Sequence, residues 1–318
     1  MSVTNPFLQV SEIKKVIVQH SSLLNAMNGL NQCVMSQSHL YNPWCALLTG
    51  QAGVGKTNLC MLLVKKYDAP NDVSLGIRST KVGCFYTQIP SPVTIRSLAS
   101  CMLGKLGDPS PNQGTAMSMT KRLIKLLQAS DTKLVLLDEF QHLLSSGGSF
   151  NSGLLDSVRN WLKTLLDNTK VSFVLIGMPE CAQLIHNDQQ LSRRFQKRLH
   201  LRNIPLNDGS TPAFQIFLAA FSKEVARITG CEALPKFDLR DDALKVYAIT
   251  QGNPSAVAHL FSSTIVEAGC TDRKPTIEVF KEVANDEYFG NYRMTDANPF
   301  GMSPSAVMQA IVKQAEAV

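Results

Sequence analysis

The sequence predicts an α/β fold in which a five-stranded parallel sheet flanked by helices is followed by a small helical domain. Two observations favour this class. Up to Pro205, short apolar runs rich in β-forming residues alternate with segments of helical periodicity, as in βαβ units. Beyond Pro205 the strand signals fade while helical periodicity continues. At 318 residues the chain is long enough for two domains.

Five strands are expected, each a short apolar segment, at residues 44–49, 82–88, 133–137, 171–176 and 199–204. Helices are expected at residues 56–67, 93–106 and 115–129. Another lies between the third and fourth strands, where apolar residues recur at three- and four-residue spacing: Leu154, Leu155, Val158, Trp161, Leu162, Leu165 and Leu166. The later helices are expected at residues 212–229, 241–250, 254–268 and 275–288.

The composition is that of a packed protein with a basic balance. Apolar residues make up 44% and charged residues 18%, which is too apolar for a disordered chain. No apolar run approaches the roughly 20 residues of a membrane helix, and the N-terminus lacks a signal-peptide pattern. Eight cysteines without a C-x-x-C favour reduced thiols and a cytoplasmic protein without structural zinc. The net charge of +6 is compatible with nucleic acid but does not require it.

The segment after the first strand matches G-x-x-x-x-G-K-[ST], a phosphate-binding loop, between an apolar strand and an apolar helix. Its glycines let backbone N–H groups turn towards a phosphate, Lys56 reaches the outer phosphates, and the Thr57 hydroxyl ligates Mg²⁺. A chance glycine-rich turn is the alternative, which the matching flanks disfavour. The residues of the motif are Gly50, Gln51, Ala52, Gly53, Val54, Gly55, Lys56 and Thr57.

The third strand ends in Asp138 and Glu139, where a P-loop enzyme needs a second metal ligand. Asp138 is expected to hold Mg²⁺ through water and Glu139 to polarise the attacking water; two solvated acids are the alternative. No N-K-x-D or T-K-x-D occurs, so ATP is favoured over GTP. A small-molecule kinase also uses a P-loop, but the paired acids and the helical second domain favour hydrolysis coupled to motion.

The expected elements and motifs divide the chain into four segments. Residues 1–40 form an N-terminal helical segment, 41–205 the nucleotide-binding core and 206–290 a helical lid. Residues 291–318 form a C-terminal tail with a weak helix, which is either a partner-docking segment or disordered.

Residues 189–198 carry four cations and no acid just before the fifth strand. In a ring-forming ATPase, an arginine at this place can reach the γ-phosphate of the neighbouring subunit and stabilise charge in the transition state. A solvated basic face is the alternative.

Four segments, in their order and spacing, resemble the TniB/TnsC-type AAA+ ATPases of bacterial transposons. They are residues 138–144, the amphipathic helix, residues 176–180 and residues 188–195. The resemblance implies an AAA+ sheet with a helical lid, in a regulator that binds ATP and assembles as a ring or helical filament around duplex DNA. It also implies that this regulator links target-recognition proteins to the transposase. By the same resemblance Arg194 is the best match to the trans-acting arginine, with Arg193 close behind.

Two positions depart from the AAA+ pattern. Met178 stands where the fourth strand commonly ends in a polar sensor, which is compatible with slow hydrolysis. Ser255 stands in the lid where many AAA+ proteins carry an arginine that contacts the nucleotide.

DNA binding is expected to be independent of sequence, because no helix-turn-helix, zinc or other base-reading module occurs. In an AAA+ assembly the segment after the second strand faces the central channel, where hydroxyls and cations can contact phosphates. The alternative, weighted equally, is that these side chains are the solvated faces of two amphipathic helices. The candidates are Ser91, Thr94, Arg96, Lys105, Thr115 and Lys121.

Three other classes share the P-loop. A helicase loader or initiator would be expected to carry a dedicated DNA-binding domain or a helicase-contacting segment, and a signalling switch to carry long repeats. A secretion-type ATPase would be expected to add a membrane or envelope-binding module. The sequence shows none of these additions.

Overall fold

The structure is a computed structural model that describes residues 6–67, 81–145 and 152–316. The described residues form two compact units. Unit 1 holds residues 6–22, 53–55 and 202–316, and unit 2 holds residues 23–52 and 56–201. The segment expected over residues 1–40 is thus divided between the two units. Among the described residues, no helix is both long enough and apolar enough to cross a lipid bilayer.

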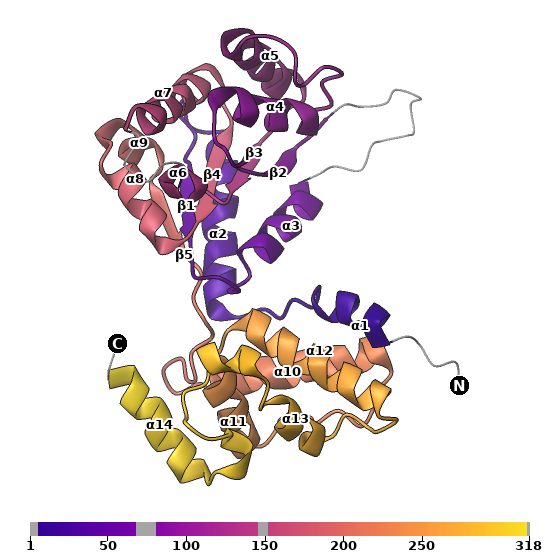
Figure 1. Ribbon diagram of the computed structural model, residues 1–318. Coiled ribbons are helices and arrows are strands. Elements are labelled where there is room, and N and C mark those ends of the chain that lie inside the picture. Colours follow the sequence, from indigo (N-terminus) through magenta and orange to yellow (C-terminus); the bar gives the residue numbers. More distant parts are fainter. Residues whose placement is uncertain (1–5, 68–80, 146–151, 317–318) are drawn as a thin grey trace. The chain divides into compact units, whose positions relative to one another are not determined.

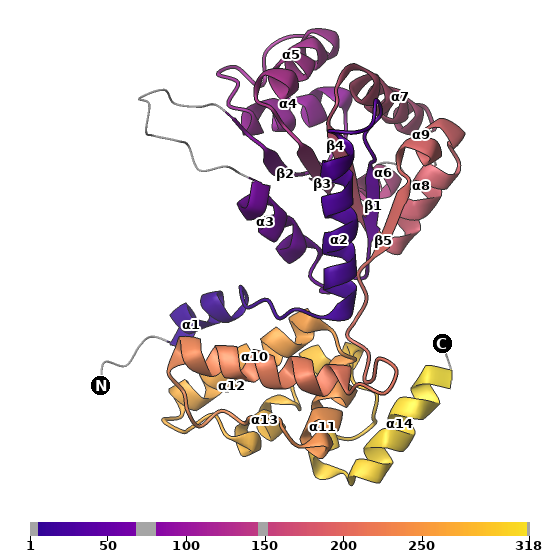
Figure 2. The ribbon, with the colours of Figure 1, turned by 180° about the vertical axis from the view of Figure 1, so that it is seen from behind.

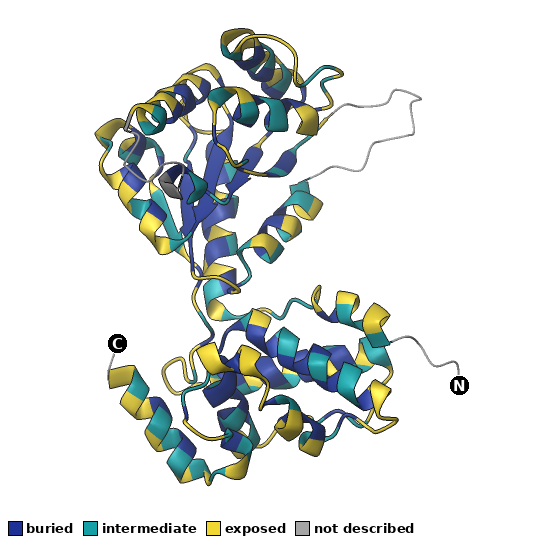
Figure 3. Ribbon diagram, viewed as in Figure 1, coloured by how far each residue is buried: buried dark blue, intermediate teal, exposed yellow. Residues whose placement is uncertain are grey.

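The centre of unit 2 is a parallel sheet, whose order among the described residues is β2-β3-β4-β1-β5. Its strands are β1 (Ala46–Thr49), β2 (Cys84–Gln88), β3 (Leu134–Asp138), β4 (Ser172–Gly177) and β5 (Lys197–His200). The expected five-stranded parallel sheet is confirmed. The strands β1, β3 and β4 are buried along their whole length (Figure 3), as is usual for parallel strands covered on both faces. Thr49, Asp138 and Gly177 therefore end at one edge of the sheet.

The fifth strand differs from the expectation, because it lies earlier in the chain than residues 199–204. It pairs with β1 over Lys197–His200, and Leu201 then donates its N–H to the Thr49 carbonyl at 2.8 Å. The N–H of Ile204 instead donates to the Gly252 carbonyl at 2.9 Å within unit 1. The chain therefore leaves the sheet before its apolar run ends.

Helices cover both faces of this sheet (Figures 1 and 2). One face carries α2 (Ser21–Ser36) and α3 (Lys56–Tyr67), and the other carries α4 (Ile95–Lys105), α5 (Ala116–Ala129) and α7 (Ser152–Asn168). Trp161 of α7 is buried, as the helical periodicity predicts, and its Nε1 donates to Thr120 Oγ1 at 2.9 Å. The polar group of this indole is thus satisfied inside the core.

Short elements complete unit 2 between β3 and β5. They are α6 (His142–Ser145), η2 (Pro179–Cys181), α8 (Ala182–His186) and α9 (Gln189–Arg194). Asp188 is the N-cap of α9, and its carboxylate accepts from two N–H groups of the first turn. Lys163 of α7 contacts the same carboxylate at 2.8 Å, so Asp188 also joins α7 to α9.

Unit 1 is helical. Its elements are α1 (Pro6–Ile13), α10 (Ala213–Thr229), α11 (Arg240–Thr250), α12 (Pro254–Cys270), α13 (Ile277–Val283) and α14 (Pro304–Glu316), with the short turns η3 (Glu287–Asn291) and η4 (Pro299–Gly301). Aromatic rings fill the core: Phe261 contacts Phe237 and Phe280 with centroid separations of 5.7 and 5.0 Å. Ile13 of α1 is fully buried in the same core. The C-terminal helix α14 packs on α11 through Val307 and Ile311.

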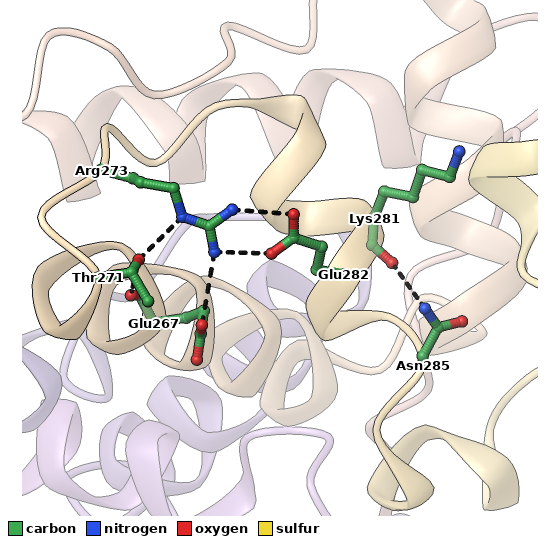
Figure 4. Close-up of polar contacts among 6 residues, drawn as sticks. All are labelled: Glu267, Thr271, Arg273, Lys281, Glu282 and Asn285. Atoms are coloured by element: carbon green, nitrogen blue, oxygen red, sulfur yellow. Dashed lines mark hydrogen bonds and ion pairs between the residues drawn. The ribbon is translucent and has the colours of Figure 1, made fainter.

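The helix expected over residues 275–288 is shorter in the structure, where α13 spans Ile277–Val283. Arg273, in the loop before α13, donates to both carboxylate oxygens of Glu282 at 2.9 and 2.7 Å and contacts Glu267 at 3.4 Å (Figure 4). After α13, the Asp286 carboxylate caps η3. A separate turn therefore replaces the last part of the expected helix.

Candidate nucleotide-binding site

The glycine-rich loop lies between β1 and α3, in the strand–loop–helix order that the motif predicts. Gly53 and Gly55 have φ values of +78° and +96°. Residues with a side chain rarely adopt such values, so the loop itself requires glycine at these positions. Because α3 begins at Lys56, the unpaired N–H groups of its first turn and its positive end adjoin the loop. This arrangement suits an anion such as a phosphate.

Lys56 is folded onto its own loop. Its Nζ donates to the carbonyl oxygens of Gly50 at 2.6 Å and Gln51 at 2.9 Å. Partial burial lowers the pKa of this ammonium group, and the nearby carboxylates of Asp138 and Glu139 oppose that shift. The cation thus has neutral carbonyl partners, which are weaker partners than the oxygens of a phosphate.

Asp138 is buried at the end of β3, with 1% of its surface exposed. Its Oδ2 accepts from the hydroxyls of Tyr86 at 2.8 Å and Thr57 at 3.2 Å, and its Oδ1 accepts from the N–H of Glu139 at 2.8 Å. Burial, together with the hydrogen bond to Asp138, raises the pKa of the Tyr86 phenol. Three donors satisfy the buried carboxylate. The structure therefore brings together Thr57 and Asp138, which are far apart in the sequence.

Glu139 follows β3 in the left-handed conformation, with φ +62°. Such a conformation costs a residue with a side chain about 1–3 kcal/mol. Two hydrogen bonds tie the next residues to β4 or its end: Phe140 N–H donates to Ile176 O at 2.9 Å, and Gln141 Oε1 accepts from Met178 N–H at 3.3 Å. The Nε2 of Gln141 donates to Glu139 Oε2. Glu139 therefore lies at the same sheet edge as Asp138, with its carboxylate held by a neighbouring amide.

The two arginines at the end of α9 have different surroundings. Arg194 donates to Asn42 Oδ1 and to Asp167 Oδ1, each at 2.5 Å, and its side chain is 28% exposed. Arg193 is exposed and has no intramolecular polar partner within the described residues. Asn42 and Asp167 also line a cavity of about 530 Å³. That cavity adjoins the starts of β3 and β4, whereas the glycine-rich loop follows the end of β1, so it is separate from the candidate site.

The sequence matches the family described as "Bacterial TniB protein" over residues 12–203, which is more than half of the 318 residues. The chain belongs to the TniB family. The matched range includes the glycine-rich loop, Asp138, Glu139 and both arginines of α9.

Two curated relatives match parts of this TniB-family chain. General secretion pathway protein A of Aeromonas hydrophila is 28% identical over 178 residues, which are 54% of this chain and 29% of that protein. Chaperone protein ClpB of Mycoplasma pneumoniae is 27% identical over 168 residues, which are 52% of this chain and 21% of that protein. The chain therefore spans less than a third of the length of these two relatives.

Solved structures share the fold. The ORC2 protein of Aeropyrum pernix, in ADPNP–ADP complexes, has a TM-score of 0.58 at 16% identity and covers 81% of this chain and 67% of its own. The ORC1 protein of the same organism, in complex with DNA, has a TM-score of 0.54 at 19% identity and covers 85% of this chain and 66% of its own. At these identities the likeness concerns the fold alone. It confirms the AAA+ fold, and together with the family it confirms the expected AAA+ ATPase class.

The residues predicted for DNA contact in this TniB-family protein lie on and around α4 and α5, and five of them have defined surroundings. Thr94 and Thr115 cap these two helices, where their hydroxyls accept from backbone N–H groups. Arg96 donates to the Asn112 carbonyl at 3.0 Å. Lys105 and Lys121 are exposed and form no ion pair within the described residues. Arg96 is exposed as well and its partner is a neutral carbonyl, so Arg96, Lys105 and Lys121 all carry a charge that is available to a partner. Ser91 is exposed just before α4.

Sequence reasoning missed two polar side chains of this site, Tyr86 and Gln141. Tyr86 lies on β2, whose register places Gln88 opposite Asp138, and side chains two residues apart share a face. Gln141 follows Glu139 by two residues. The strand β2 ends in three residues with polar groups, Tyr86, Thr87 and Gln88, so the sequence alone does not single out Tyr86; its role follows from the register with β3. In unit 1, Ser255 lies in the first turn of α12, and its N–H donates to Asn253 Oδ1 at 3.0 Å.

Proposed function

We propose that this TniB-family protein is an ATP-dependent, self-assembling, DNA-binding regulator of transposition that links target recognition to the transposase. Family membership supports the role in transposition, and the AAA+ fold supports nucleotide-dependent assembly. The observation that carries the ATPase part is the Thr57 hydroxyl 3.2 Å from the buried carboxylate of Asp138, beside the half-buried cation of Lys56.

The roles of the residues follow from this geometry. Lys56 binds the outer phosphates of ATP, exchanging its bonds to two neutral carbonyl oxygens for bonds to anionic phosphate oxygens. Thr57 and Asp138 fit a hydrated Mg²⁺, because they supply a hydroxyl and a carboxylate side by side, the oxygen ligands this ion prefers. When bound, Mg²⁺ neutralises charge on the transferred phosphoryl group. Glu139 accepts a hydrogen bond from the attacking water and orients it.

Assembly completes the site in this proposal. Arg193, which has no intramolecular partner within the described residues, contacts the nucleotide of a neighbouring subunit, and Arg194 supports the end of α9 through Asn42 and Asp167. Lys105 and Lys121 contact DNA phosphates without reading sequence. The ORC1 protein with the similar fold was solved in complex with DNA, which is consistent with this part of the proposal. The replication-initiator alternative rests on that fold likeness alone.

Nucleotide binding and turnover are expected to separate in two variants. Lys56→Ala loses the cation that holds the phosphates and is expected to lose ATP binding. Glu139→Gln keeps the cation, Thr57 and Asp138, so it is expected to bind ATP and to lose turnover. Binding is measured with a fluorescent ATP analogue and turnover by phosphate release. Parental turnover in Glu139→Gln would show that another group orients the water.

Electron microscopy of Glu139→Gln with ATP and random duplex DNA tests assembly. Rings or continuous helical filaments on DNA are expected, and Lys56→Ala is expected to form neither. A protein that stays monomeric and does not bind DNA would instead favour a signalling switch. Cosedimentation of the transposase from the same transposon with the ATP-bound assembly tests the remaining link, and no ATP-dependent cosedimentation would contradict it.

A further inference from the structure

The side-chain amide of Gln141 joins two parts of the candidate site. Its Nε2 donates to Oε2 of Glu139, and its Oε1 accepts from the N–H of Met178 at 3.3 Å. The partners fix the orientation of the amide, because a carboxylate only accepts and a backbone N–H only donates. A side chain with a donor and an acceptor at one end is therefore required to make both contacts.

One peptide group connects this amide to the glycine-rich loop. The Met178 N–H that donates to Gln141 belongs to the peptide whose carbonyl, that of Gly177, accepts from the N–H of Gly50 at 3.2 Å. Gly177 also makes room for the amide, since a Cβ added there would lie 2.9 Å from Gln141 Oε1. Hydrogen bonds therefore run from the first residue of the loop, through the end of β4, to the carboxylate of Glu139.

The Glu139 carboxylate has one oxygen held and one available. Gln141 contacts Oε2, and Oε1 has no hydrogen-bond partner within the described residues. A carboxylate fixed through one oxygen can present the other to a water molecule with little loss of freedom in the reaction. The thioether of Met178 offers only a weak acceptor where a polar sensor is expected, whereas the amide of Gln141 offers both a donor and an acceptor.

We propose that Gln141 is a positioning residue for hydrolysis, which holds the Glu139 carboxylate and couples it to the glycine-rich loop through the Gly177–Met178 peptide. This inference rests on the proposed ATPase function. Gln141 acts through Glu139 and has no role in binding the nucleotide. Its loss should therefore affect turnover and spare affinity.

Gln141→Met keeps the length of the side chain and removes both polar atoms. It is expected to lower kcat by about 10–100-fold, the scale of a misplaced catalytic group, with KM and ATP affinity unchanged. Gln141→Glu keeps an acceptor for Met178 but places a carboxylate against Glu139, and it is expected to lose at least as much turnover. In the Glu139→Gln background, Gln141→Met is expected to cause no further loss. Turnover near the parental value in either single variant, or the same fold loss in both backgrounds, would overturn the proposal.

A spectroscopic measurement on the nucleotide-free protein separates this inference from the proposed function. The side-chain NH₂ signal of Gln141, assigned by its absence in Gln141→Met, and the backbone signal of Met178 are expected to shift in Glu139→Ala. The NH₂ signal of Gln183, an exposed residue of α8, is the control and should not move. Unchanged Gln141 and Met178 signals would refute the inference even in a protein with normal turnover. A parental protein without turnover would refute the proposed function, whatever the spectrum shows.

Discussion

Arg193→Ala tests which arginine of α9 acts between subunits. Arg193 has no intramolecular polar partner within the described residues, so the residue is expected to serve a neighbour, and its loss should reduce turnover of the assembly by about 10³–10⁵-fold. Arg194→Ala removes the contacts with Asn42 and Asp167 instead. That ion pair joins side chains that are 28% and 57% exposed, so its loss should cost only about 0.2–1 kcal/mol of unfolding free energy. The two variants should therefore separate activity from stability.

Two quantities are measured for each variant. One is the rate of phosphate release, at DNA and protein concentrations high enough for full assembly, and the other is Tm. Mixing Arg193→Ala subunits with Glu139→Gln subunits should restore part of the activity, because some shared sites then contain an intact Glu139 from one subunit and an intact Arg193 from the next. Arg194→Ala should retain turnover and lower Tm by no more than about 4 °C. The reasoning is refuted if Arg193→Ala turns over ATP within about 3-fold of the parent, or if no mixing ratio restores activity.

Two further predictions concern pH and DNA. Burial lowers the pKa of His20 below its ordinary value of 6.5, so the unfolded chain takes up its proton first and the stability of unit 1 should fall as pH drops below 6.5. A His20→Gln variant should show a weaker fall of Tm in thermal scans between pH 7.5 and pH 5.5, each about one unit from the ordinary histidine pKa. An unchanged dependence of Tm on pH would exclude His20 as the cause. DNA affinity should fall steeply as the salt concentration rises. Lys105→Ala and Lys121→Ala should each make the slope of the logarithm of the binding constant against the logarithm of the salt concentration shallower by about one unit. Lys170→Ala, an exposed lysine before β4, is the control, and equal slopes in all three variants would move the DNA surface elsewhere.

The parts of the site that were predictable from the sequence are those fixed by local patterns. The glycine-rich loop and the apolar strand before Asp138 are contiguous segments, and the residue types in each predict its local backbone structure. Because the strands are parallel, their carboxyl ends then bring the two motifs to one edge of the sheet. The remaining contacts depend on register and on packing between distant segments. Arg194, for example, donates to Asn42, 152 positions away, and to Asp167, 27 positions away. No local pattern indicates such pairs, and the family resemblance that favours Arg194 over Arg193 does not indicate them either.

The left-handed conformation of Glu139 provides a last test, because it separates stability from function at one residue. With φ +62°, the side chain of Glu139 carries a backbone cost that a glycine would not. Glu139→Gly and Glu139→Ala both lose the carboxylate and its contact with Gln141, and they differ only in the β-carbon. The glycine variant should therefore have the larger free energy of unfolding, measured by denaturant titration. The difference should be no more than about 1 kcal/mol, because the freedom that glycine gains in the unfolded chain offsets part of the relieved strain. Both variants should lack turnover. If the alanine variant were instead more stable than the glycine variant by about 0.5–1 kcal/mol, which is the cost of the extra freedom of glycine in the unfolded chain, the backbone at Glu139 would carry no strain.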